Sequence, residues 1–118
     1  MRIEQLSGTK ASLRTVDGKA VRIYETEIND ANMLKVSVGT NGPCGGDSGH
    51  GARTYFALED LSSTDMRISI NGSEYEDVMG RSVEFIFGGD AEIRTLLVAL
   101  KFAVHCLEHQ LLFGEDNH

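Results

Sequence analysis

Apolar and polar residues alternate along much of the chain up to residue 88, which is the pattern of β-strands that bury one face. The run from 33 to 38 shows it most plainly, because Leu34, Val36 and Val38 alternate with Lys35 and Ser37. We expect the three aliphatic side chains to face the core and the lysine and serine to face water. The same reasoning predicts further strands over residues 3–6, 13–16, 20–28, 54–58, 66–70 and 83–87.

Turn residues separate several of these runs. Asp17-Gly18 is a pair that a tight type I′ hairpin requires, and Asn71-Gly72 is a second such signal. Residues 59–65 are acidic and serine-rich and predict a connector, while residues 73–80 predict a polar excursion. The last run, 83–87, is the most aromatic, and we expect it to be the central strand of the sheet.

The period lengthens after Gly88-Gly89 to that of a helix. Asp90 is a residue type that caps helix N-termini, and Gly114 is suited to a C-cap. Between them, apolar residues recur at spacings of four and three, at Ile93, Leu97, Leu100, Val104, Leu107 and Leu111. The pattern predicts an amphipathic helix of about six turns. Its stripe is wide for a monomer, which favours a homo-oligomer contact through this helix.

Strands followed by one long helix predict an α+β fold in a single domain, residues 1–118. We expect an antiparallel meander of five to seven strands with the C-terminal helix packed on one face.

The charge of the chain is acidic, with 18 acidic and 11 basic residues, a formal net charge of -7 and an isoelectric point of about 4.9. This balance argues against direct binding of nucleic acid through a basic face and permits binding of a basic protein. The chain shows no signal segment, and no apolar run reaches the roughly 20 residues of a membrane span. We therefore expect a cytoplasmic protein without membrane contact, in which Cys44 and Cys106 do not form a disulfide.

The stretch from residue 39 to residue 53 is the strongest candidate for a functional site. It holds six of the 13 glycines and Pro43, the one proline of the chain. Glycine is entropically costly, so its concentration indicates a loop that needs positive φ or close approach of the backbone. We expect a long shaped loop between two strands.

Three reactive residues of this loop suit a metal. Cys44, Asp47 and His50 offer a thiolate, a carboxylate and an imidazole within seven residues, which are ligand types that zinc accepts. Zinc would need a further ligand, which would come from Asp90, Cys106, or His105 and His109, or be a water. The alternative is structural, with Asp47 accepting backbone N–H groups and His50 bracing the loop.

The loop also suits an anion, because successive glycines can direct backbone N–H groups at a phosphate. Arg53, Asp47 and Ser48 would then bind the ligand, such as a nucleotide. A third reading takes Ser48 as a nucleophile, since Gly46-Asp47-Ser48-Gly49 matches the tetrapeptide of trypsin-like proteases. The chain is about half the length that such enzymes need, and its histidines do not complete the set.

The segments 38–42, 45–51 and 53–56, with Ser63-Thr64-Asp65 and Gly88-Gly89-Asp90 before the leucine-rich helix, resemble a family of small phage and mobile-element proteins of Gram-positive bacteria. The resemblance covers residues 34–110 and carries Asp47, His50 and Arg53. It implies an anti-defence, anti-CRISPR-like inhibitor that binds a basic surface of a host defence nuclease without catalysis. The alternatives are a protein that sequesters a nucleotide signal at the loop and a small metal-dependent hydrolase.

Overall fold

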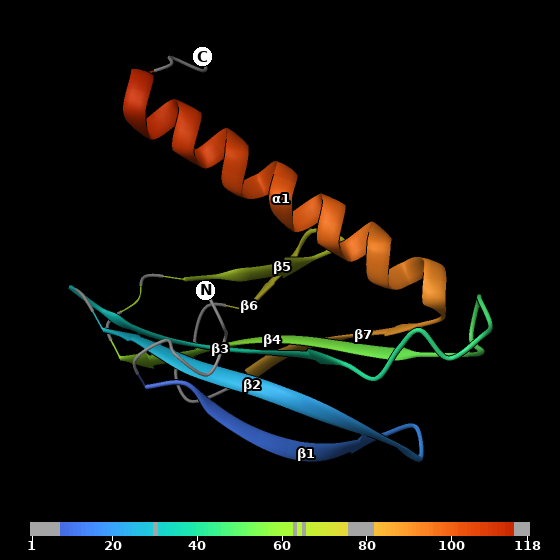
Figure 1. Cartoon of the computed structure of the whole chain (residues 1–118). Coiled ribbons are helices and arrows are strands. Elements are labelled where there is room, and N and C mark those ends of the chain that lie inside the picture. The colour runs from blue at the N-terminus through green and yellow to red at the C-terminus, as the bar shows by residue number, and fades with distance from the viewer. Residues whose placement is uncertain (1–7, 30, 63, 65, 76–81, 115–118) are drawn as a thin grey trace.

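The computed structural model describes residues 8–29, 31–62, 64, 66–75 and 82–114. Five antiparallel strands form the main sheet in the order β1-β2-β3-β4-β7, and one long helix lies over it (Figure 1). A second sheet consists of β5 and β6. The predicted α+β fold is confirmed. The elements are β1 (Lys10–Val16), β2 (Lys19–Asn29), β3 (Met33–Thr40), β4 (Arg53–Ser62), β5 (Ile68–Ile70), β6 (Ser73–Tyr75), β7 (Ser82–Gly88) and α1 (Asp90–Phe113).

Both turn signals form the hairpins that the sequence predicts. Asp17 and Gly18 have φ of 51° and 76°, as a type I′ turn between β1 and β2 needs. Asn71 and Gly72 have φ of 50° and 83° and join β5 to β6. The prediction of a polar excursion is therefore wrong for residues 73–75, which form β6. The connector prediction is wrong for residues 59–62, which continue β4, and the strand predicted over 3–6 lies outside the described residues.

The aromatic strand β7 lies at an edge of the sheet, and β3 is central. The prediction that residues 83–87 form the central strand is wrong. Phe85 of β7 packs against Phe56 of β4, with ring centroids 6.2 Å apart. The aromatic residues of β7 thus pack against a neighbouring strand on one face of the sheet. An edge strand can make such a contact as well as a central strand can.

The sheet is strongly rolled, because its two edge strands meet. Arg14 on β1 donates to Glu84 on β7 at 2.9 Å, although three strands separate them in the sheet. Rolling of this kind follows from the right-handed twist that accumulates across strands. The inner face of the roll holds the buried apolar cluster, which consists of Val16, Val21, Ile23, Tyr55 and Ala57.

This rolling reverses the predicted exposure of β3. Ser37 pairs in register with Ala57 on the inner face and is only 7% exposed, whereas Val38 on the opposite face is 37% exposed. Alternation along one strand identifies two faces but does not say which of them the sheet will enclose.

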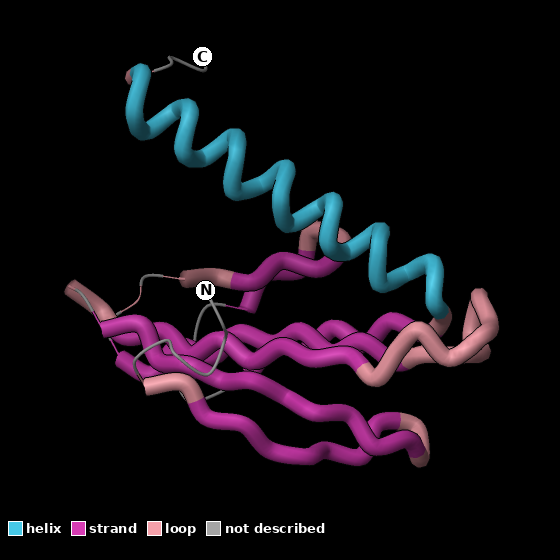
Figure 2. The backbone as a smooth tube through the Cα atoms, viewed as in Figure 1, coloured by secondary structure: helices cyan, strands magenta, loops and turns pink. Residues whose placement is uncertain are grey.

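The outer face of the sheet lies toward α1. Tyr24, Val38, Phe56 and Phe85 form a row across β2, β3, β4 and β7 by register. Figure 2 shows that the helix begins close to the end of the sheet and then diverges from it. No residue of the described helix is buried.

The helix ends differ from the prediction at one end. Gly89 is the N-cap of α1 and Asp90 is its first helical residue, so Asp90 is not the N-cap. Its carboxylate points back to the glycine-rich loop, as described below. At the other end Gly114 forms the predicted left-handed C-cap with φ of 60°, and its N–H donates to the Gln110 carbonyl at 3.0 Å.

Candidate functional site

The glycine-rich loop connects β3 to β4 and packs against the start of α1. Two backbone bonds join it to β7 and to Gly89. The N–H of Gly49 donates to the Gly88 carbonyl at 2.9 Å, and the N–H of Gly89 donates to the Ala52 carbonyl at 2.8 Å. The loop, the end of β7 and the first turn of the helix therefore form one unit.

The Asp90 carboxylate sits at the centre of this unit and accepts four backbone N–H groups. Oδ1 accepts from Cys44 and Ala52, each at 3.0 Å. Oδ2 accepts from Gly45 at 2.6 Å and from Gly46 at 3.2 Å. The N–H groups of Cys44 and Ala52, followed by those of Gly45 and Gly46, lower the pKa of Asp90 to about 2.

The arrangement is an anion-binding nest occupied by a carboxylate of the same chain. The prediction that the glycines direct N–H groups at an anion describes this geometry, but the anion is Asp90. Gly51 allows the approach, since a Cβ there would lie 2.7 Å from Asp90 Oδ1.

Asp47 makes the reciprocal contact from the loop to the helix. Its Oδ1 accepts the N–H of Ala91 at 2.8 Å, which is one of the free donors of the first helical turn. The N–H of Asp90 in turn donates to the Gly46 carbonyl at 2.7 Å. The structural alternative for Asp47, acceptance of backbone N–H groups, matches this contact.

Arg53 braces the same loop with every nitrogen of its guanidinium. Nε donates to Asp17 at 2.8 Å, Nη2 to the Gly49 carbonyl at 2.8 Å, and Nη1 to the Ala52 carbonyl at 3.1 Å. The side chain is 11% exposed. Arg53 therefore joins the β1–β2 turn to the loop, and these donors are not free for a ligand. Ser48 is exposed and has φ of 49°.

The structure does not bring Cys44, Asp47 and His50 together as a metal-ligand set. Cys44 Sγ donates to the Asn41 carbonyl at 3.2 Å, Asp47 caps the helix, and His50 is exposed. Among the described residues, no group of three His, Cys, Asp or Glu side chains is placed to hold a metal. His105 and His109 on α1, with ring centroids 6.4 Å apart, fall under the same finding.

A polar network inside the rolled sheet was not predicted. The Tyr55 hydroxyl donates to Glu84 at 2.5 Å, and Arg14, which pairs with Glu84, lies over the Tyr55 ring at 4.7 Å. Burial, followed by the bond to Glu84, raises the pKa of Tyr55 to about 12. Lys35 pairs with Glu59 at 3.1 Å, and this bond is the main cause that raises the lysine pKa. No local motif signals these contacts, because they join strands distant in sequence.

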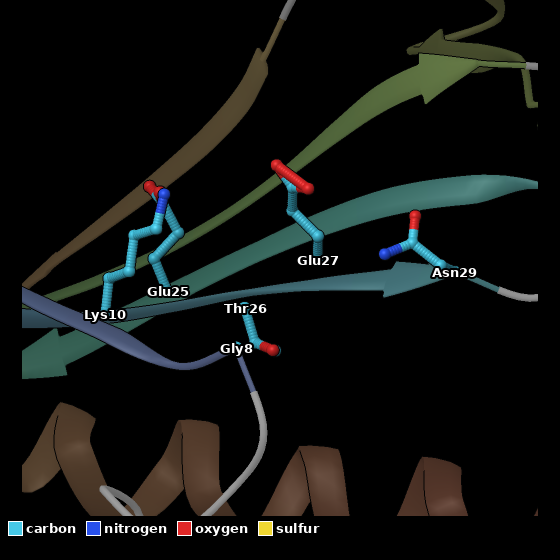
Figure 3. Close-up of a pocket in the computed structure, with 6 residues that line it drawn as sticks. All are labelled: Gly8, Lys10, Glu25, Thr26, Glu27 and Asn29. Carbon is cyan, nitrogen blue, oxygen red and sulfur yellow. The ribbon is translucent and has the colours of Figure 1, made fainter.

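Two of the hollows along the described sheet differ in character, since one is lined by polar residues and the other is apolar. One of about 360 Å³ lies beside the second half of β2, where Figure 3 shows Lys10, Glu25 and Glu27 on one side of the strand and Thr26 on the other. The other, of about 510 Å³, is an apolar groove between α1 and the outer face, lined by Tyr24, Val38, Ile93, Leu96, Leu97 and Leu100 among others.

The prediction that no stretch is long enough to span a membrane is wrong by length and composition. The described chain has one such helix, Asp90–Phe113, with a mean hydropathy of 1.4 and no part of that window buried. Core helices of soluble proteins and signal sequences share this length and composition.

The fold and this region together define an α+β protein whose glycine-rich loop is closed on the helix by internal carboxylates. No protein-family model matches the chain, and neither does any curated protein or solved structure. The resemblance to phage and mobile-element proteins therefore stays a prediction.

Proposed function

We propose that the protein acts by contact with another protein, as an inhibitor that binds a basic surface of a host defence nuclease. The observation that supports this most is that the reactive groups of the loop make hydrogen bonds within the chain itself. The nest is filled by Asp90, Asp47 caps the helix, and each nitrogen of the Arg53 guanidinium donates within the fold. A loop committed in this way supports a shaped surface better than a catalytic or nucleotide-binding site.

The charge of the chain supports a basic partner. The described residues carry 11 acidic and 9 basic side chains, a formal charge of -2, so most of the acidic excess of the whole chain lies outside them. Within the described part, Glu25 and Glu27 share a face toward the C-terminal end of β2 (Figure 3). Glu27 is exposed and pairs in register with Lys35. This end is the candidate contact for a Lys- or Arg-rich surface.

The test is protection of target DNA in cells. The chain is expressed in bacteria that carry a CRISPR nuclease and its guide, and surviving transformants of a targeted plasmid are counted. The proposal expects survival well above that of cells without the chain. Purified nuclease and chain should form a complex whose affinity falls as ionic strength rises, because exposed charge pairs are screened.

Two matched variants locate the contact. Glu27→Lys and Glu74→Lys change the charge equally at exposed positions, on β2 and on β6. Glu27→Lys should reduce protection and affinity, while Glu74→Lys should retain both. Absence of protection against every nuclease tried, or a complex insensitive to salt and to Glu27→Lys, would contradict the proposal.

A further inference from the structure

Helix α1 leaves a large apolar surface uncovered. Eight of its Val, Leu and Phe side chains are 50–84% exposed, namely Leu97, Val98, Phe102, Val104, Leu107, Leu111, Leu112 and Phe113. Four of them, Leu97, Val104, Leu107 and Leu111, recur at helical spacing along one side, and the other four lie elsewhere around the helix. One side of the helix is thus an apolar surface that the described part of the subunit leaves uncovered.

The radius of gyration of the chain also indicates that the helix is not packed closely on the sheet. The radius of gyration is 15.9 Å, against roughly 13.5 Å for a compact domain of this length. The difference agrees with the divergence of the helix from the sheet in Figure 1. The apolar groove of about 510 Å³ lies where the helix and the sheet begin to separate.

The apolar stripe of the helix has a repeat of 3.5 residues, which is the repeat of a coiled-coil seam. Its first half, Ile93, Leu97 and Leu100, lines the groove. Its second half, Val104, Leu107 and Leu111, is exposed by 54%, 66% and 84%. Neither half of the stripe is fully covered within one subunit. In an antiparallel pair of helices, the first half of one stripe would pack against the second half of the other.

Charges beside the stripe select the antiparallel direction. Arg94, Lys101 and Glu108 are spaced by seven and lie along one flank of the stripe. In an antiparallel pair this flank meets itself, so Arg94 faces Glu108 of the second copy twice, while Lys101 faces its own copy near the two-fold axis, so the attractive pairs number two against one repulsive pair. In a parallel pair the flank would meet Leu96, Ala103 and Gln110, which carry no charge.

We propose that two copies of this chain form a two-fold dimer through antiparallel α1 helices. The seam consists of Leu97 against Leu107 of the second copy, Leu100 against Val104, and Ile93 against Leu111. The exposed half of each helix covers the groove of the other subunit, which gives a closed isologous interface. This inference is independent of the proposed nuclease partner.

The same charged flank makes a dimer a better occupant than a bilayer. Lys101 lies near the middle of the helix, and Arg94 and Glu108 continue the charge on the same side. A lone spanning helix would place these side chains in hydrocarbon, where charge is costly. A dimer leaves all three at the edge of the seam in water, with Arg94 paired to Glu108 of the second copy.

Native mass spectrometry and light scattering test the dimer directly. The wild-type chain should have twice the 12.9 kDa mass of one copy. Leu107→Glu with Leu111→Glu should give a folded monomer, because both side chains are exposed within one subunit. Phe102→Glu is the matched control, since Phe102 is 69% exposed on the opposite side of the helix and should leave the dimer intact.

A charge exchange distinguishes the antiparallel dimer from other associations. Arg94→Glu should weaken the dimer by about tenfold, because two attractive pairs become repulsive. Adding Glu108→Arg to the same chain should restore the wild-type dissociation constant. A wild-type monomer, a dimer unaffected by the leucine variants, or no rescue by the second exchange overturns the proposal.

Flotation with phosphatidylcholine and phosphatidylglycerol vesicles tests the bilayer. The dimer should remain in the soluble fraction. A chain that floats with vesicles and is monomeric in buffer shows that lipid covers the helix, and that result also overturns the proposal.

Discussion

Asp90 organises the glycine-rich loop, because its own carboxylate fills the anion-binding nest that a ligand could otherwise occupy. Four N–H groups converge on it from residues 44, 45, 46 and 52. Asp90 is the first residue of the helix, and its short side chain reaches this nest. A longer Glu side chain at the same position would have to fold back. The bonds favour the ionised form, which links the closed loop to pH.

Asp90→Asn should lower stability at neutral pH and lose that effect in acid. The folded-state pKa of about 2 is below the ordinary aspartate value of 3.8, so ionised Asp90 stabilises the fold above about pH 4. This stabilisation is lost as the pH falls from 4 through 2. Urea unfolding at several pH values should therefore show the wild type and Asp90→Asn differing most above pH 4 and converging toward pH 2.

Exposed Glu74→Gln is the control for that series and should follow the wild-type curve. A constant difference between the wild type and Asp90→Asn from pH 6 to pH 2 would mean that the carboxylate charge is not what the nest recognises.

Gly51 and Gly49 form a matched pair for the shape of the loop. Both have positive φ, 69° and 91°, but a Cβ at Gly51 would meet the Gly46 carbonyl and Asp90 Oδ1, whereas one at Gly49 would meet nothing within 4 Å. Gly49→Ala should cost about 1–2 kcal/mol from backbone strain alone. Gly51→Ala should cost at least ~1 kcal/mol more because of the added crowding. Equal urea midpoints for the two variants would contradict the close approach of Asp90.

At the scale of elements, helix α1 is capped by a residue far from it in sequence. Gly89 has no side chain to cap the helix, and Asp47 supplies the carboxylate instead. The loop and the helix therefore exchange one carboxylate each, and neither should be ordered without the other.

Asp47→Ala should destabilise the fold by about 1 kcal/mol, the usual worth of an N-cap acceptor. Hydrogen exchange should locate the effect, with faster exchange of the Ala91 amide and little change at Gln110 near the other end of the helix. Ser48→Ala, next to it in the loop, should leave both amides unchanged. Unaltered exchange at Ala91 in Asp47→Ala would show that the cap is not formed.

Strands were predictable where their signals are local. Asp17-Gly18 and Asn71-Gly72 mark hairpins through the φ values that only a few residue types adopt readily. The order of strands is not local, so β7 was expected at the centre and lies at the edge. The extension of β4 to Ser62 depends on pairing with β3, which an acidic and serine-rich segment does not signal.

At the scale of the molecule, the helix leaves apolar surface on the outer face of the sheet uncovered. The inner face holds its own buried cluster around Val21 and Tyr55, while the helix side remains open. The proposed dimer would close that side, so its formation and the stability of the native state should be coupled.

The melting temperature should therefore rise with protein concentration in the wild-type chain, because only the folded state dimerises. Scanning calorimetry over a hundredfold range of concentration measures this. The Leu107→Glu and Leu111→Glu double variant should melt at one temperature throughout. A concentration-independent wild type would show that folding does not depend on a second copy.

The sequence by itself determined the α+β class, the two hairpin turns, the long helix with its glycine C-cap, and the glycine-rich loop as the unusual segment. These features depend on local periodicity and on backbone angles that particular residues favour. Only the tertiary structure decided which face of β3 is enclosed, that Asp90 fills the nest and that Arg53 is a brace. Each of these depends on contacts between residues 35 or more positions apart, or on the rolling of the whole sheet. Such contacts leave no pattern in neighbouring residues, so they become visible only when the chain is folded.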